Sequence, residues 1–283
     1  MELTWHVHNP ESRAERILVV GGSLGGDTAH QWGLTADHLA HDAQVVFVHL
    51  PGQGMGAPWD DEVEPTMTNL AEALAATVAR IRESRGDLAT YYAGLSLSGA
   101  LGLHLARDHS DLVRGVAVLG SAATVGTPEA WREKAQHVDE HGTASLVEAT
   151  QERWFTPDFV AGESARVAAI MEGLATADDH SYAQLCRCLA THDVRADLGN
   201  LYTPLLLIAG ERDESTPLRD VELVLESAPG ADMRIVPDVA HQITVSAPGT
   251  VADILRGWFR RLEQEHWSIY DVVDTEGETR LGH

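Results

Sequence analysis

Basic residues are scarce in this chain, and their shortage excludes two kinds of partner. Only 20 of the 283 residues are Lys or Arg, against 43 Asp or Glu, so the net charge at pH 7 is −23. Such a charge repels nucleic acid and anionic membranes, and we expect neither as a partner. The simplest role of so many carboxylates is a solubilising surface. If the substrate is an anion, a local cation must hold it against this field.

Cysteine and long apolar runs are also scarce. The only two cysteines, Cys186 and Cys188, lie two residues apart in a predicted helix and therefore point to different sides. They are poor candidates for a disulfide or a metal site, and we expect no metal or other cofactor. The first residues carry no basic region followed by an apolar run, and no stretch reaches the length of a membrane span. We therefore expect a cytoplasmic protein without a signal peptide.

Apolar strands and amphipathic helices alternate through the first 122 residues. We predict strands at 2–8 (edge strand), 16–22 and 44–50, a strand that opens at Thr90 and breaks at Gly94, and a strand at 113–121. Helices are predicted at 28–41 and 68–85 and, after the break at 94–99, through Leu101, Leu103 and Leu105. This alternation predicts right-handed crossovers and a mostly parallel sheet flanked by helices, which is an α/β fold.

The alternation stops near residue 123 and resumes near residue 203. Only helices are predicted in between, at about 128–141, 143–154, 163–176 and 177–191. A strand at 203–213, a helix at 217–227, a last strand at 231–237 and a closing helix at 248–265 follow. We expect a core of residues 1–122 and 203–266 and a helical cap of residues 123–202 over the carboxyl ends of the strands. The polar residues 267–283 are predicted to form an extended or disordered tail.

A serine stands at the turn between a predicted strand and a predicted helix. The turn reads Gly94-Leu-Ser-Leu-Ser-Gly, and small residues around a serine in this context are typical of the G-x-S-x-G nucleophile turn. Ser98 occupies the place of the second glycine, but serine is still small. The alternative is that Ser96 is an ordinary turn serine, because short motifs match by chance.

An aspartate and a histidine follow the two strands after the cap. Asp213 lies just past the strand that begins at 203, and His241 lies just past the next strand. In a parallel sheet both emerge at the same edge as Ser96, in the chain order Ser, Asp, His of α/β-hydrolases. A serine hydroxyl needs a base, and the base needs a carboxylate to orient it. Asp213 could instead cap the next helix, and His241 is one of 15 histidines, but a Ser96–His241–Asp213 triad is the more economical interpretation.

A glycine-rich loop, residues 21–27, precedes the first predicted helix. It lacks the lysine of a P-loop and the spacing of a dinucleotide-binding motif. A loop in this place can instead donate a backbone N–H to a developing oxyanion. The N–H of Leu97, directly after the nucleophile, is the other expected donor.

The chain resembles the α/β-hydrolase superfamily, and within it the 3-oxoadipate enol-lactone hydrolases, over nearly all of residues 1–265. The motifs that carry the resemblance are the serine turn at 94–99, Ala209-Gly-Glu-Arg-Asp-Glu-Ser-Thr-Pro, the loop of His241, and the cap segments 126–131, 152–157 and 182–197. Gly-Ser-Leu-Gly at 22–25 looks like the family's Asn-Ser-Leu-Gly loop, which places the N–H of Ser23, next to Leu24, in the oxyanion hole. The chain departs from the family at Ser98, at Gly21-Gly22 and at His49.

The resemblance implies a serine hydrolase that opens 3-oxoadipate enol-lactone with water through an acyl-enzyme, without a cofactor. Its substrate would be a small anionic lactone, whose carboxylate needs a cap cation. Arg132, Lys134 and Arg153 flank Trp131 and Trp154, and any of the three could serve or could be a solvated helix cation. The tryptophans could be pocket walls or cap core. The alternatives are another ester or lactone hydrolase or a perhydrolase with the same triad, and a ligand-binding relative without catalysis.

Overall fold

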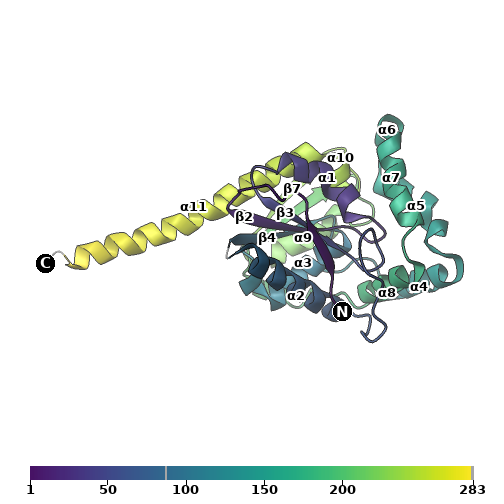
Figure 1. Ribbon diagram of the computed structural model, residues 1–283, viewed down its shortest axis with the longest axis horizontal. Helices are drawn as coiled ribbons and strands as arrows, with labels where there is room; N and C mark the ends of the chain where they lie inside the picture. Colours follow the sequence, from purple (N-terminus) through teal and green to yellow (C-terminus); the bar gives the residue numbers. More distant parts are fainter. Residues whose placement is uncertain (87, 282–283) are drawn as a thin grey trace.

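A seven-stranded sheet in the order β1-β3-β2-β4-β5-β6-β7 forms the centre of the molecule (Figure 1). The computed structural model describes residues 1–86 and 88–281, with side chains as far as residue 264. The strands are β1 Thr4–Val7, β2 Arg16–Gly21, β3 Gln44–His49, β4 Ala89–Leu95, β5 Val116–Leu119, β6 Leu205–Gly210 and β7 Ala231–Val236. Only the edge pair β1–β3 is antiparallel among the described pairs. The prediction of a mostly parallel sheet is therefore confirmed.

Both faces of the sheet are covered by helices, because strand side chains alternate between two apolar cores. Along β2, Ile17 and Val19 belong to one buried cluster, and Leu18 and Val20 belong to the other. The first face packs against α2 Met67–Arg85, α3 Leu97–Asp108 and α9 Leu218–Ser227. The second packs against α1 Thr28–His38 and α11 Pro248–Leu281. The short helices η1 Ser110–Leu112, η3 Leu198–Asn200 and α10 Ile243–Ser246 lie in connections.

The strand order reverses at the pair β2–β4, and this reversal positions the site. The chain leaves β2 toward β3 on one side and leaves β4 toward β5 on the other. Loops at such a switch point diverge and leave a crevice at the carboxyl edge of the sheet. Gly21, the last residue of β2, is in register with Gly94, the next-to-last residue of β4. The glycine-rich loop and the serine turn therefore start side by side.

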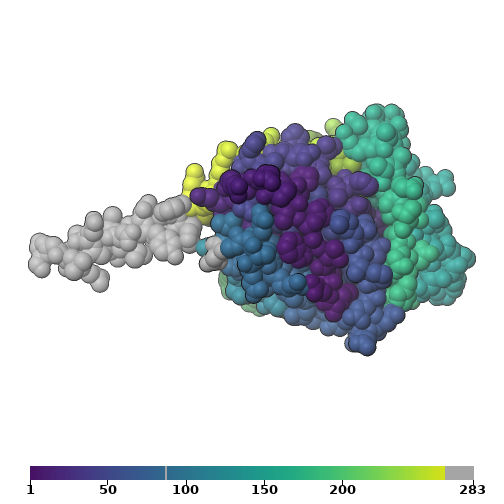
Figure 2. Space-filling model, in the orientation of Figure 1, coloured from purple at the N-terminus to yellow at the C-terminus, as the bar shows by residue number. Residues whose placement is uncertain are grey.

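Helices alone connect β5 to β6. They are α4 Pro128–His141, η2 Thr143–Leu146, α5 Val147–Trp154, α6 Pro157–Gly162, α7 Ser164–Ala175 and α8 Asp179–Leu189. They gather at one end of the molecule, coloured teal to green in Figure 2. Helix α4 begins where Thr127 accepts a hydrogen bond from the Ala130 N–H and Pro128 takes the first helical position.

Helix α6 was not predicted, although its start carries the same signal as α4. Thr156 caps it by accepting from the Phe159 N–H at 3.3 Å, and Pro157 takes its first turn. A threonine followed by proline stands at the start of both helices, at residues 127–128 and 156–157. The signal is local and was available in the sequence.

The closing helix is longer than predicted. Helix α11 runs from Pro248 to Leu281, so the expectation of an extended or disordered segment from residue 267 is wrong as far as residue 281, and residues 282–283 lie outside the described part. No proline follows Pro248, so nothing with the wrong backbone geometry stops the helix. Among the described residues, no helix combines the length and apolarity that crossing a membrane requires.

Candidate active site

Ser96 lies at a strained turn between β4 and α3. Its backbone angles are φ 58° and ψ −115°, a conformation that few residues other than glycine adopt and that is concentrated at functional sites. Its N–H donates to the Leu119 carbonyl at 2.7 Å. A Cβ on Gly94 would lie 2.1 Å from the Ser98 carbonyl oxygen, so this neighbour has to be glycine. The turn exposes the Ser96 hydroxyl at the carboxyl edge of the sheet.

The structure brings the three predicted residues into one hydrogen-bonded chain. His241 Nε2 lies 2.9 Å from Ser96 Oγ, and His241 Nδ1 lies 2.8 Å from Asp213 Oδ2. Asp213 and His241 are buried, only 5% and 3% exposed. This geometry lets the imidazole accept a proton from the serine while the carboxylate holds the other ring nitrogen.

Asp213 is held as a carboxylate by its surroundings. Its Oδ1 accepts the N–H groups of Ser215 and Thr216 at 2.8 Å and 3.0 Å, and its Oδ2 accepts the Thr216 hydroxyl at 2.8 Å. Burial alone raises the pKa of this carboxyl, but the charge and hydrogen bond of His241, with the Thr216 bonds, outweigh burial and hold the pKa below its usual value. Asp213 therefore stays charged where it can orient and stabilise a protonated His241.

The prediction that the Ser23 N–H faces the oxyanion is wrong. That N–H donates to the side-chain oxygen of Gln31 at 2.8 Å and is not free for a ligand. The N–H of the next residue, Leu24, makes no hydrogen bond in the part of the chain that the structure describes, and Leu24 lines the pocket above Ser96. The N–H of Leu97 is the first of α3 and belongs to the helix N-terminal groups that lack an intrahelical acceptor.

A pocket of about 320 Å³ opens over Ser96 and His241. Most of its wall comes from the cap. The lining residues are Leu24, Ser96, Val125, Gly126, Ala130, Trp131, Lys134, Thr150, Arg153, Trp154, Tyr182, Glu214, Ser215 and His241. Its size suits a small molecule.

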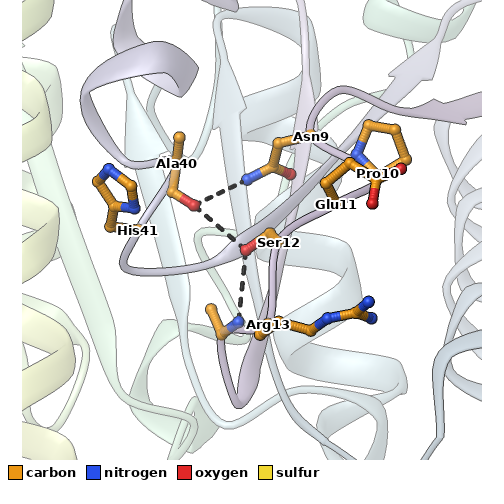
Figure 3. A pocket seen from close by; sticks show the side chains of 8 residues that line it. Asn9, Pro10, Glu11, Ser12, Arg13, Ala40 and His41 are labelled. Carbon is orange, nitrogen blue, oxygen red and sulfur yellow. Dashed lines mark hydrogen bonds between the residues drawn. The ribbon is translucent and has the colours of Figure 1, made fainter.

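A larger hollow, of about 670 Å³, lies away from this chemistry beside the connection from β1 to β2 (Figure 3). Two of its polar side chains are bound to backbone: Asn9 and Ser12 both donate to the Ala40 carbonyl, at 3.1 Å and 3.2 Å. No side chain there is paired as nucleophile and base. The smaller pocket over Ser96 is therefore the candidate site.

The structure separates the three predicted cap cations. Lys134 and Arg153 line the pocket, whereas Arg132 is exposed on α4 and pairs with Glu129 at 3.3 Å. Lys134 Nζ lies 5.1 Å from the Trp131 ring centre and 5.9 Å from that of Tyr182. Neither Lys134 nor Arg153 forms an ion pair within the described residues.

Burial is the main cause that lowers the pKa of Lys134, and the nearby charge of Arg153 lowers it further. An anion bound beside Lys134 would relieve this cost, because it would supply an opposite charge to a cation that has no ion-pair partner among the described residues. The exposed Glu214 also lines the pocket.

Both predicted tryptophans line the pocket. Trp131 donates its indole N–H to the Val125 carbonyl at 2.5 Å, and the buried Trp154 ring lies 6.3 Å from the His241 ring. Trp154 also packs in the apolar cluster of α5 and α7, so it is both pocket wall and cap core.

Sequence reasoning missed Tyr182 and Thr150 as pocket residues and named Leu24 only as the neighbour of Ser23. Tyr182 comes from α8, which packs against α4, and Thr150 stands one helical turn before Trp154 on α5. The spacing of Thr150 from Arg153 and Trp154 puts all three on one helix face, which is the signal that could have found it.

Within the described residues no group of His, Cys, Asp or Glu could hold a metal ion, and Cys186 and Cys188 are free and buried.

Comparison with known proteins identifies the family of this chain. Residues 15–248 match the family model of the alpha/beta hydrolase fold. This chain belongs to that family. The chain is similar to 3-oxoadipate enol-lactonase 1 of Acinetobacter baylyi, with 27% identity over 92% of this chain and 94% of the relative. It is also similar to 3-oxoadipate enol-lactonase 2 of the same organism, with 31% identity over 56% of this chain and 58% of the relative.

Solved structures give the same fold. The enol-lactonase of Burkholderia xenovorans LB400 superposes with a TM-score of 0.79 at 24% identity, covering 93% of this chain and 96% of that one. The chain is therefore a hydrolase of the alpha/beta hydrolase fold family.

Proposed function

We propose that this hydrolase opens 3-oxoadipate enol-lactone to 3-oxoadipate by a serine-based acyl-enzyme mechanism. The observation that carries the proposal is the Ser96–His241–Asp213 chain beneath a pocket that contains Lys134 without an ion-pair partner among the described residues. The similarity to enol-lactonases along nearly the whole chain supports the substrate.

The first half of the reaction forms an ester on Ser96. Ser96 Oγ attacks the lactone carbonyl as His241 Nε2 takes its proton, and Asp213 stabilises the imidazolium. The N–H groups of Leu24 and Leu97 stabilise the oxyanion. The carbonyl reforms as the bond to the ring oxygen breaks, and this oxygen leaves as an enolate, which His241 protonates. An enolate is a better leaving group than an alkoxide, so ring opening is easy once the tetrahedral intermediate forms.

The second half releases the product. Water gives a proton to His241 and attacks the Ser96 ester, and the tetrahedral intermediate collapses with Ser96 leaving and regaining the proton. The enol tautomerises to the ketone of 3-oxoadipate. No redox step or group carrier is required, since water is the only co-reactant.

The cap supplies the charge that such a substrate needs. Lys134 and Arg153 line the pocket, and Trp131 and Tyr182 enclose Lys134. With a net charge of −23, the protein as a whole repels an anion, so binding depends on these local cations. We propose that they bind the free carboxylate of the lactone.

The test is the loss of enol-lactone absorbance with purified protein, run beside Ser96→Ala. Removal of a triad nucleophile should reduce turnover by a factor on the order of 10⁶. Fast hydrolysis that vanishes in the variant would support both substrate and nucleophile. If the lactone is stable while aryl esters are cleaved in a Ser96-dependent way, the protein is an esterase or perhydrolase with the same triad. If neither is cleaved and a serine-directed phosphonate does not label Ser96, the protein is a non-catalytic binding relative.

A further inference from the structure

The glycine-rich loop after β2 is folded around the side chain of Gln31. This residue comes from α1 and is 1% exposed. Its Oε1 accepts the Ser23 N–H at 2.8 Å, and its Nε2 donates to Ser23 Oγ at 2.5 Å. A backbone N–H can only donate, so the amide orientation is determined. One side chain thus holds both the backbone and the hydroxyl of Ser23.

The two glycines nearest this amide leave it room. A Cβ on Gly22 would lie 2.4 Å from Gln31 Oε1, and one on Gly26 would lie 1.9 Å from Gln31 Nε2. Both distances are too short for any side chain at these positions unless the amide moves. Glycine at positions 22 and 26 therefore leaves space for the Gln31 amide. This packing explains why the loop is rich in glycine although it matches neither phosphate-binding motif.

A second amide links the same serine to the histidine loop. Gln242 directly follows His241, and its Nε2 donates to Ser23 Oγ at 3.0 Å. Its backbone N–H donates to the carbonyl of Trp154 in the cap at 3.1 Å. Ser23 and Gln242 are both fully buried. The hydroxyl of Ser23 therefore joins the loop after β2 to the loop after β7, and through Gln242 to the cap.

The consequence for catalysis concerns which N–H faces the substrate. Gln31 occupies the Ser23 N–H, whereas the N–H of Leu24 has no hydrogen-bond acceptor among the described residues, and Leu24 lines the pocket. Oxyanion donors are effective only when they are fixed in place before the charge develops. A loop of glycines cannot fix itself, since glycine restricts its own backbone least.

We propose that Gln31 is a positioning residue for the oxyanion hole, and that Gln242 keeps this loop in register with His241. Gln31 does so by holding Ser23 so that the Leu24 N–H points at the carbonyl under attack. The inference rests on the proposed serine-hydrolase function, but it does not depend on the identity of the ester or lactone.

The test compares Gln31→Met with Thr35→Val in the full chain, using an aryl ester as substrate. Methionine has a similar length to glutamine and forms neither hydrogen bond. Thr35 is a matched control, because it is also buried on α1 and donates one hydrogen bond, to the Thr244 carbonyl at 3.0 Å, without touching Ser23. For each variant we would measure kcat, KM, the inhibition constant of a boronic acid that forms a tetrahedral adduct with Ser96, and Tm.

We expect Gln31→Met to lower kcat by about 10- to 100-fold, with KM within about twofold, because a misplaced donor costs less than the 10²–10³ of a deleted one. Affinity for the boronic acid should fall by the same factor as kcat, since both depend on the oxyanion donors. Thr35→Val should lower Tm and leave kcat within about twofold. If Gln31→Met lowers Tm but leaves kcat and boronic acid affinity at the values of Thr35→Val, Gln31 is only structural and the inference is overturned.

Two further variants keep the inference testable if Gln31→Met does not fold. Gln31→Glu keeps an acceptor oxygen for the Ser23 N–H and should retain kcat within about tenfold of the wild type. Ser23→Ala removes the acceptor of both amides and should lower kcat by about tenfold at constant KM, whereas an unchanged kcat would overturn the inference.

Failure of the inference can be told apart from failure of the proposed function. If wild-type protein cleaves aryl esters but not the enol-lactone, the substrate is wrong and the comparison of variants is still valid. If the wild type cleaves neither and is not labelled at Ser96 by a phosphonate, the function fails and the inference fails with it. If the wild type is active and the variants are equally active, only the inference fails.

Discussion

Lys134 and Arg132 stand two residues apart on α4 and lie in opposite environments. Lys134 lines the pocket between the rings of Trp131 and Tyr182, whereas Arg132 is exposed and pairs with Glu129. Residues two apart on a helix are about 200° apart around its axis, so one faces the pocket when the other faces solvent. Substituting Lys134 or Arg132 therefore removes one positive charge either from the pocket face or from the solvent face of the same helix.

We predict that Lys134→Met raises KM for the anionic lactone by about 10- to 100-fold, because a hydrogen bond to a charged group is worth about 1.5–3 kcal/mol. Turnover of a neutral aryl ester should change by less than about threefold. Arg132→Met is the control and should change neither value. Steady-state kinetics on the two substrates measures the effect, and an equal loss on both substrates would show that Lys134 supports the pocket rather than binding the carboxylate.

We predict that Asp213→Asn reduces kcat on the order of 10⁴-fold, the loss that the corresponding change causes in serine proteases. The amide keeps the shape of the side chain but no longer demands a proton on His241 Nδ1, so the tautomer that accepts from Ser96 is lost. Thr216→Val, which removes one hydrogen bond to Asp213 Oδ2, keeps the charge and should cost about tenfold or less. Similar rates for Asp213→Asn and the wild type in stopped-flow assays would remove Asp213 from the mechanism.

The buried pair His104–His192 should make the fold sensitive to acid. His104 Nε2 and His192 Nδ1 lie 3.1 Å apart, His192 Nε2 lies 2.9 Å from the Ala122 carbonyl, and Arg107 lies beside His104 Nδ1. Burial, with the neighbouring His192, lowers the pKa of His104 to about 3, and burial also lowers that of His192. Asp108, close to His104, opposes the shift only in part.

Both folded-state pKa values lie below the unfolded value of about 6.5, so the unfolded state binds more protons below that pH. Stability is therefore complete above pH 6.5 and falls as the pH drops toward 3, by up to about 1.4 kcal/mol per pH unit for His104. The lowered pKa of His192 adds to the loss in the same direction. Urea unfolding at pH 7.5, 6 and 5 measures this slope. His104→Gln should flatten it, and the exposed His137→Gln should leave it unchanged. A slope that His104→Gln does not alter would contradict the assignment.

Ser98 stabilises the loop after β2 rather than the serine turn alone. Its hydroxyl donates to the buried Gly22 carbonyl at 2.6 Å. We predict that Ser98→Ala lowers the free energy of unfolding by about 1–3 kcal/mol, the cost of a buried acceptor that loses its donor. The exposed Ser84→Ala, which removes a hydrogen bond within α2, should change it by less than about 0.5 kcal/mol. Equal values for the two variants in urea unfolding would be evidence against this role.

Patterns close together in the sequence determined the architecture and the meeting of the three site residues. Apolar runs ending in turns predicted the parallel strands, and such strands present their carboxyl ends at one edge. Ser96 directly follows β4, and Asp213 and His241 lie in the loops that follow β6 and β7, so their meeting needed only the strand order. The helical region between β5 and β6 could be predicted from the sequence, because helix caps and periodicity are local signals.

Tertiary packing alone decided which polar groups are free for a ligand. The Ser23 N–H is occupied by a side chain eight residues further on, and the Gly22 carbonyl is bonded to Ser98 from another strand end. No local pattern specifies these partners, so the occupation of the Ser23 N–H could not be predicted from the sequence. Likewise, the choice of Lys134 over Arg132 depends on how α4 is rotated against α8. Sequence therefore determined where the site lies, and long-range packing determined which of its neighbouring donors and cations face into it.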